Sequence, residues 1–225
     1  MQTKRTVIRL IGMLAMVAPS AWADVGQDLS IKGDDGEPIE SLPVPSASDP
    51  STLPGILWRG GKSADLTLYE FFDYDCGFCR KAALELDAIL KADSKIRLGL
   101  INNPILSVGS VQAAKVEQAV LQLYGPERAY DFHVRLFAKR GRSDGLDALE
   151  IVKSIGLDAR KVENLGDSSL VSEQLSLQSR FASKLDLLMT PSFIVAGVVI
   201  LGWPGKKSFQ SIIANARRCN RPICK

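Results

Sequence analysis

The sequence contains very little histidine and cysteine. Its 225 residues include one His, at position 133, and four Cys. Four cysteines are too few for a disulfide-dense scaffold. A structural zinc site normally needs a second close pair of Cys or His ligands, so the close pair Cys76 and Cys79 is a poor half-site for zinc. His133 has no Cys or second His within ligand spacing, and we expect a surface or hydrogen-bonded residue there.

Long apolar runs are missing after the first residues. Residues 1–23 combine three basic side chains in the first nine positions, the apolar stretch Leu10–Ala18 and an Ala-Trp-Ala ending. This pattern predicts a secretory signal peptide that is cleaved after Ala23. The apolar stretch is well short of the ~20 residues that span a bilayer, which disfavours a transmembrane anchor.

The predicted mature chain has no excess of either charge. The whole chain has 28 basic and 25 acidic residues, and the predicted signal holds three basic and no acidic ones, which leaves 25 of each. This balance gives no electrostatic reason to expect a nucleic acid or an anionic membrane as partner. We expect an exported bacterial protein of the periplasm, a compartment where disulfides persist.

The rest of the chain divides into a polar arm and one domain. Residues 24–55 are rich in Pro, Ser, Gly and Asp and lack an apolar period, which predicts a linker or a loosely attached arm. Residues 56–218 are expected to form the domain. Within it, Leu66–Phe72 is typical of a buried strand, a helix with one apolar face follows, and Lys95–Ile101 is a second strand. This order favours a parallel pair of strands.

A block of predicted helices interrupts the domain at about residues 105–188, and the chain then returns to sheet. The predicted helices are Ser110–Tyr124, one that begins near Pro126, Leu146–Ile155 and Leu170–Leu187. Two short strands, Ser192–Ala196 and Val198–Leu201, predict a hairpin, and Lys206–Arg218 predicts a last helix before the tail 219–225.

The segment Cys76-Gly77-Phe78-Cys79 opens the helix after the first strand. A helix N-terminus favours an anion, because its backbone N–H groups are unpaired and the macrodipole is positive there. Cys76 is therefore the predicted attacking thiolate. Cys79 lies one turn along the same helix face, where it can attack a mixed disulfide formed at Cys76. The pattern predicts a redox-active dithiol.

Two runs carry a family resemblance. Residues 70–80 read EFFDYDCGFCR, and residues 190–195 read TPSFIV. With the order of elements above, they resemble the DsbA-like thiol:disulfide oxidoreductases of the thioredoxin superfamily over about residues 66–216. The resemblance implies an α/β protein with a thioredoxin-like fold, in which a central mixed sheet is flanked by helices and carries an all-helical insertion.

The resemblance also implies roles for single residues. It implies that Pro191 is cis and lies beside the cysteine pair, and that Thr190 helps to hold an extended substrate through backbone hydrogen bonds. Glu70 matches a buried carboxyl group that assists proton transfer at Cys79. A charged residue in an apolar strand needs a partner or a raised pKa, unless it faces water on an edge strand. Phe78 either contacts substrate or shields the disulfide.

Departures from the family pattern leave the direction of catalysis open. Strongly oxidising members carry Pro-His between the cysteines, whereas this chain has Gly-Phe, so we expect a weaker oxidant. Asp73 and Asp75 place negative charge near Cys76 and would oppose its ionisation, which Arg80 and Lys81 would partly offset. A Thr before the cis-proline resembles the pattern of isomerase- and reductase-type relatives more than that of the strongest oxidases.

A second close pair, Cys219 and Cys224, lies in the C-terminal tail with Pro222 between its members. In an oxidising compartment we expect a local structural disulfide; free thiols, a shuttle pair and metal ligands are the alternatives.

We therefore predict a periplasmic thiol:disulfide oxidoreductase that forms or reshuffles disulfides in cysteine-containing exported proteins, without a cofactor or metal. A membrane redox partner would recycle it. A reductase or isomerase of dedicated substrates is one alternative. A dithiol module that handles Cu(I), a soft ion suited to sulfur ligands, is another. The sequence leaves the oligomeric state open.

Overall fold

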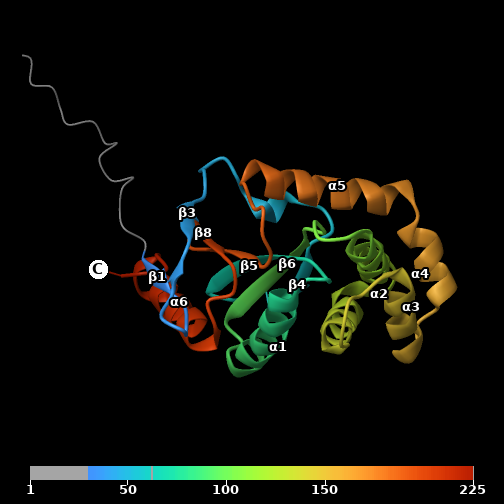
Figure 1. Ribbon diagram of the computed structural model, residues 1–225, viewed down its shortest axis with the longest axis horizontal. Coiled ribbons are helices and arrows are strands. Elements are labelled where there is room, and N and C mark those ends of the chain that lie inside the picture. Colours follow the sequence, from blue (N-terminus) through green and yellow to red (C-terminus); the bar gives the residue numbers. More distant parts are fainter. Residues whose placement is uncertain (1–29, 62, 225) are drawn as a thin grey trace, which may run out of the picture.

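The computed structural model describes residues 30–61 and 63–224 (Figure 1). The predicted signal peptide and residues 24–29 of the predicted arm lie outside these ranges. No helix within them is long and apolar enough to cross a membrane.

A six-stranded mixed sheet forms the centre of the fold, with the strand order β3-β8-β7-β5-β6-β4. The parallel pair is β5 and β6, as the sequence predicted, and the other neighbours are antiparallel. This sheet, flanked by helices and joined to a helical insertion, confirms the predicted fold class. The strands are β3 Ser41–Pro43, β4 Leu57–Arg59, β5 Leu66–Phe72, β6 Ile96–Asn102, β7 Ser192–Val195 and β8 Val198–Leu201.

Helix α1, Gly77–Ala92, joins β5 to β6 and packs on one face of the sheet (Figure 1). Side chains alternate between the two faces of a strand, so Leu68 and Phe72 of β5 lie in the core with α1. Phe71 points to the opposite face and packs in a second cluster with residues near the end of α5, Ser169–Lys184. The two faces of β5 are therefore both covered.

The insertion contains α2 Val108–Ala138, α3 Gly145–Ser154, α4 Ala159–Gly166 and α5. Gly125, with φ of 81°, interrupts the helical backbone of α2, and Pro126 begins its second half, where the sequence predicted a new helix. Helix α4 was not predicted. Its apolar face consists of Ala159, Val162, Leu165 and Gly166, which is only two turns of helix and too short a pattern to stand out in the sequence.

The polar arm differs from the prediction. β3 pairs with β8 at the edge of the main sheet, and β1, Ile31–Lys32, pairs with β2, Pro38–Ile39. Between β1 and β2, the Asp34 carboxylate accepts hydrogen bonds from backbone N–H groups in the first turn of helix α6, Lys206–Cys219. From residue 30 onward the arm is attached by backbone and capping hydrogen bonds. Such bonds do not require a periodic pattern of apolar residues, so no sign of this attachment is present in the sequence.

Candidate active site

Cys76 is the N-cap residue of α1. Its Sγ accepts a hydrogen bond from the backbone N–H of Cys79 at 3.1 Å and lies 3.1 Å from the carbonyl oxygen of Thr190. The side-chain hydrogen bond with Cys79, and the backbone N–H groups of Cys79 and Phe78, lower the pKa of Cys76 to about 6 against the opposing effect of burial. Only 5% of Cys76 is exposed, so the thiolate is stabilised but narrowly accessible.

Cys79 lies behind Cys76 and is completely buried among the residues of the main core. Burial strongly raises the pKa of its thiol, and the hydrogen bond to Cys76 and the negative charge of Glu70 raise it further. The two cysteines of one motif thus differ sharply: the outer one ionises readily and the inner one holds its proton. This is the asymmetry that an attacking thiol and a resolving thiol require.

The Thr190–Pro191 step lies against this pair, and its peptide bond is cis. Thr190 directs its carbonyl oxygen at Cys76 Sγ, while its Oγ1 is buried and has no hydrogen-bond partner among the described residues. Pro191 is buried and its carbonyl oxygen accepts a hydrogen bond from the N–H of Gly202. The structure therefore brings the two sequence-distant motifs together.

Glu70 occupies a central strand, with Leu100 of β6 on one side and Phe193 of β7 on the other. The edge-strand alternative is therefore wrong: Glu70 is fully buried. Neither carboxyl oxygen has a hydrogen-bond partner within the described ranges. Burial, with a smaller effect from the charge of Cys76, raises the pKa of Glu70 to about 8. By strand alternation it faces the same side as Leu68 and Phe72, which is the side of α1.

The acidic residues before Cys76 connect the active-site turn to the insertion. Asp73 accepts hydrogen bonds from the N–H of Leu106 and from Ser110 Oγ, both at 2.9 Å. Asp75 accepts one from the N–H of Ser143 at 2.8 Å. Both carboxylates are thus held by neutral donors in the helical segment. We predicted that the charges of Asp73 and Asp75 would oppose ionisation of Cys76. Neither charge is among the main causes of the shift in the Cys76 pKa.

Arg80 is likewise used differently from the prediction. Its Nε donates to the carbonyl oxygen of Phe137 at 3.0 Å, and its guanidinium also donates to the carbonyl oxygen of Gly141. No ion pair joins it to Asp73 or Asp75 in the described part of the chain. Arg80 instead fixes the loop after α2 beside the start of α1.

A buried polar cluster that was not predicted from the sequence lies beneath the active-site turn. Tyr74 donates its hydroxyl hydrogen to Glu117 Oε2 at 2.9 Å, and the same hydroxyl lies 3.2 Å from His133 Nδ1. Asn102 also donates to Glu117. Burial raises the pKa of Glu117 to about 7, against the lowering effect of these hydrogen bonds, and burial lowers the pKa of His133 to about 3.

The signal for this cluster was available. Glu117 stands at helical spacing with Ala113, Val116 and Val120, all of which are buried. A carboxylate on an apolar helix face requires a partner elsewhere in the core. His133 is hydrogen-bonded, as one of the two predicted alternatives had it, but it lies in the core and not at the surface.

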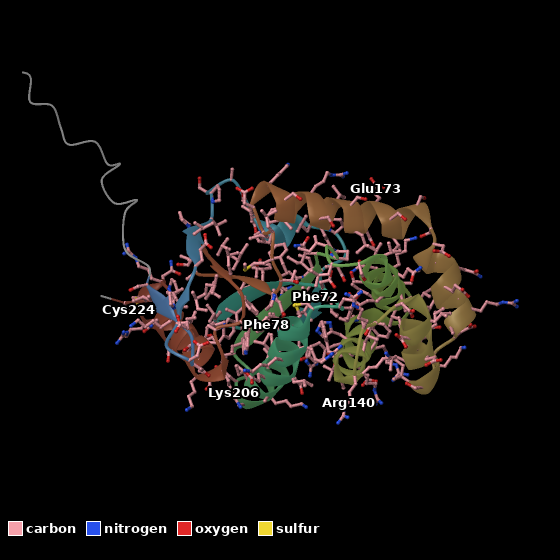
Figure 2. The ribbon with its side chains drawn as sticks, in the orientation of Figure 1. Phe72, Phe78, Arg140, Glu173, Lys206 and Cys224 are labelled. Atoms are coloured by element: carbon pink, nitrogen blue, oxygen red, sulfur yellow. A yellow bond between two sulfur atoms is a disulfide. The ribbon has the colours of Figure 1, made fainter. Side chains whose placement is uncertain are left out.

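The remaining predicted site residues lie at the surface or far from the pair. Phe78 is 69% exposed, so it does not shield Cys79. Cys219 and Cys224 form a disulfide with a Cα–Cα distance of 6.0 Å at the end of α6. Figure 2 labels Phe78 and Cys224, which lie on separate parts of the molecule. Cys76 and Cys79 are free thiols.

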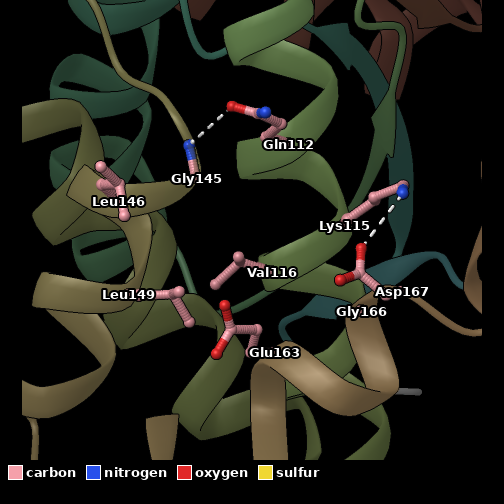
Figure 3. A pocket seen from close by; sticks show the side chains of 9 residues that line it. All are labelled: Gln112, Lys115, Val116, Gly145, Leu146, Leu149, Glu163, Gly166 and Asp167. Atoms are coloured by element: carbon pink, nitrogen blue, oxygen red, sulfur yellow. Dashed lines mark hydrogen bonds and ion pairs between the residues drawn. The ribbon is translucent and has the colours of Figure 1, made fainter. Parts of the chain in front are cut away.

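A surface pocket away from the cysteine pair offers no comparable chemistry. Figure 3 shows this pocket of about 250 Å³ between α2, α3 and α4, lined by Val116 and Leu149 and by the ion pair Lys115–Asp167. Its lining contains no thiol. Within residues 30–61 and 63–224, no group of three or more His, Cys, Asp or Glu side chains is arranged to hold a metal ion.

The fold and this dithiol define a thioredoxin-like oxidoreductase. A family model described as "Thioredoxin" matches residues 52–215, and the chain belongs to that family. A thioredoxin-like oxidoreductase from Silicibacter pomeroyi DSS-3 is 30% identical, with a TM-score of 0.68; the match covers 74% of this chain and 94% of that chain.

Other solved structures share the fold at lower identity. The thiol-disulfide exchange protein alpha-DsbA2 from Wolbachia pipientis is 22% identical, with a TM-score of 0.66, and the match covers 72% of this chain and 87% of that chain. A periplasmic thioredoxin-like protein from Salmonella enterica serovar Typhimurium is 19% identical, with a TM-score of 0.64 and coverages of 74% and 92%. No curated protein matches the chain significantly. The family model and the 30% identical relative confirm the predicted thioredoxin superfamily, and the structures at 22% and 19% identity show the same fold.

Proposed function

We propose that the protein forms or reshuffles disulfides in cysteine-containing exported proteins of the periplasm through the Cys76–Cys79 couple. The observation that carries this proposal is the asymmetry of the pair, in which Cys76 has a lowered pKa at a helix N-terminus and Cys79 is buried with a raised pKa. The signal-like residues 1–23 and the periplasmic relative support the location.

The exchange follows from the geometry. A substrate thiolate attacks Cys76 Sγ of the oxidised pair, the Cys76–Cys79 bond breaks, and Cys79 leaves with the electron pair and takes up a proton. A second substrate thiolate then attacks the substrate sulfur of the mixed disulfide. This step forms the substrate disulfide and releases Cys76 as a thiolate. The pair is reduced by two electrons and the substrate is oxidised by two.

Glu70 is the proposed proton donor and acceptor for Cys79. Its carboxyl group is buried on the side of the sheet that carries α1, and when ionised it raises the pKa of the Cys79 thiol. With a pKa of about 8 it is mostly protonated at neutral pH and can protonate the departing Cys79. In the reverse direction its carboxylate form removes the proton that Cys79 must lose before it resolves a mixed disulfide.

Thr190 and Pro191 are the proposed substrate-binding residues. The Thr190 carbonyl lies close enough to Cys76 for an extended substrate segment to pass beside both. Backbone hydrogen bonding of this kind permits broad specificity. Phe78, which is largely exposed, would contact the substrate.

The low pKa of Cys76 favours oxidation or isomerisation of substrates over reduction. A thiolate that is stable at neutral pH is a good leaving group and stabilises the reduced form of the enzyme. The equilibrium reduction potential of mature protein with Cys219→Ser and Cys224→Ser tests this direction. A value of about −120 to −180 mV supports an oxidase or isomerase, whereas about −270 mV would identify a reductase.

A trapping experiment tests the substrates. Cys79→Ser removes the resolving thiol, so mixed disulfides on Cys76 should accumulate and be visible on non-reducing gels of periplasmic extracts. Cys76→Ser is the matched control and should trap nothing. If the Cys79→Ser protein carries no disulfide-linked protein, the proposed role in exported proteins is refuted.

A further inference from the structure

Exposed apolar side chains lie on the two segments that meet at Cys76, the active-site turn and the segment before Thr190. Leu188 and Met189 come directly before Thr190, and they are 80% and 48% exposed. Phe78, two residues after Cys76, is also exposed. Exposed apolar side chains that gather at one place on a soluble protein indicate a surface for another molecule.

This surface continues toward the insertion. The N–H of Leu106 donates to Asp73, next to the active-site turn, and Val108 begins α2. Leu106 is 52% exposed and Val108 is 77% exposed. We call Phe78, Leu106, Val108, Leu188 and Met189 the apolar rim.

A basic loop lies against the same turn. It comprises residues 139–142, with the sequence Lys-Arg-Gly-Arg, and joins α2 to α3. Arg80 of α1 donates to the carbonyl oxygen of Gly141, and the N–H of Ser143, the next residue after the loop, donates to Asp75. Two independent contacts therefore place this loop next to the segment that contains both cysteines.

Two arginines of the loop form no ion pair with the described residues. Lys139 forms an ion pair with Asp147 at 3.1 Å and donates to the carbonyl oxygen of Arg142 at 2.9 Å, so its charge is used within the loop. Arg140 and Arg142 are exposed, and neither forms an ion pair with any carboxylate of the described residues. Figure 2 shows Arg140 at the outer edge of the molecule below α2.

The carboxylates that contact or follow this loop are bonded to neutral donors and not to the arginines. Asp73 is buried and accepts hydrogen bonds from neutral donors, and Asp75 is occupied by the N–H of Ser143. Asp144 accepts the N–H groups of Leu146 and Asp147 as the N-cap of α3. Arg140 and Arg142 therefore make no ion pair with the carboxylates of the described residues, and their guanidinium groups can contact an acidic group of another molecule.

We propose that the basic loop 139–142 binds acidic residues of the substrate, so that the enzyme prefers cysteines that have an acidic segment nearby. Arg80 lies one helical turn from Cys76 and its side chain contacts the loop, so the path from Cys76 to the loop spans at most roughly 12 Å. An extended chain at about 3.3 Å per residue covers this in about 4 residues. The occupant is thus a segment with a cysteine, apolar neighbours and acidic residues about 4 positions away.

This inference rests on the proposed function, because it names the substrate class of the same site. The test uses three dithiol peptides with the same cysteine and apolar residues and with Glu, Gln or Lys residues four and five positions away. The second-order rate constant for their oxidation by the oxidised full-length mature protein is measured at low and high salt. Exposed charge pairs are each worth little, so we expect the Glu peptide to react about fivefold faster than the Lys peptide at low salt. The preference should shrink at high salt.

Charge reversal assigns the effect to the loop. Arg140→Glu with Arg142→Glu should invert the preference between the Glu and Lys peptides. Arg160→Glu with Lys206→Glu changes the charge by the same amount at exposed positions on α4 and α6 and should keep the preference of the natural protein. Equal rates for the Glu and Lys peptides in the natural protein, or a preference that survives reversal of the loop, overturns the inference.

Two further outcomes separate this inference from its competitors. If the Gln peptide is not oxidised at all, the proposed function fails and takes this inference with it. If the protein instead binds vesicles of anionic phospholipid through Arg140 and Arg142 while the peptides show no charge preference, the loop is a membrane contact and the inference is wrong.

Discussion

Replacement of Glu70 by Gln should stabilise the protein near neutral pH, although it removes the proposed proton donor of Cys79. Glu70 is fully buried without a hydrogen-bond partner in the described chain, and its pKa is raised from 4.5 to about 8. The folded protein therefore binds a proton more tightly than the unfolded chain does. Its contribution to stability is fully present below pH 4.5 and is lost as the pH rises toward 8.

The size of the effect follows from linkage. Each unit of pH between the unfolded and folded pKa values changes the free energy of unfolding by about 1.4 kcal/mol. At pH 7 the unfolded chain has an ionised Glu70 while the folded protein keeps it protonated, which destabilises the fold by about 3 kcal/mol. A neutral Gln has the shape of the protonated acid and avoids this ionisation, so the variant should be about 3 kcal/mol more stable at pH 7 and similar to the parent at pH 4.

Urea unfolding between pH 4 and pH 8 measures the difference, with Cys76→Ser in both proteins so that no thiolate interacts with Glu70. Glu163→Gln, on the exposed surface of α4, is the matched control and should change stability by less than about 0.5 kcal/mol at each pH. The difference in stability between the parent and the Glu70→Gln variant should widen as the pH rises. If it does not, the conclusion that Glu70 is a buried carboxyl group that keeps its proton is refuted.

Three further predictions concern the cysteines and the buried cluster. Alkylation of Cys76 by iodoacetamide should titrate with a midpoint near pH 6; a midpoint above 8 would contradict its stabilisation by α1. Removing the disulfide by Cys219→Ser and Cys224→Ser should lower the free energy of unfolding by about 2 kcal/mol, as expected for a short loop, and no loss would mean that the tail is not held by it. Tyr74→Phe leaves buried Glu117 with one donor fewer and should cost about 2 kcal/mol in urea unfolding at pH 8, whereas a negligible loss would show that this hydrogen bond does not support the turn.

Local sequence patterns were enough to predict the strands, helices and turns that depend on neighbouring residues. The strand Leu66–Phe72 has the predicted bounds, and the helix after it begins at Gly77, within the segment 76–79 that was predicted to open it. The hairpin around Gly197 also formed where turn chemistry placed it, with φ of 73° at that glycine. These features depend on neighbours in sequence, so a pattern can reveal them.

Elements that depend on distant partners were missed. β3 and β4 are three residues each, and their order comes from hydrogen bonds to β8 and β6. Helix α4 has eight residues, so its apolar face covers only two turns. For such segments the stabilising contacts are made elsewhere in the chain and leave little trace in their own residues.

The sequence by itself determined that two cysteines sit one turn apart at the start of an amphipathic helix, because helix polarity and spacing are local properties. Only the tertiary structure decided what surrounds them. It brought the Thr190 carbonyl to Cys76 across 114 positions of sequence and enclosed Glu70 between two strands. It also turned Asp73 away to the insertion. Burial and the choice of hydrogen-bond partner depend on chain segments that meet only in the folded state, and these set the pKa values on which the chemistry depends.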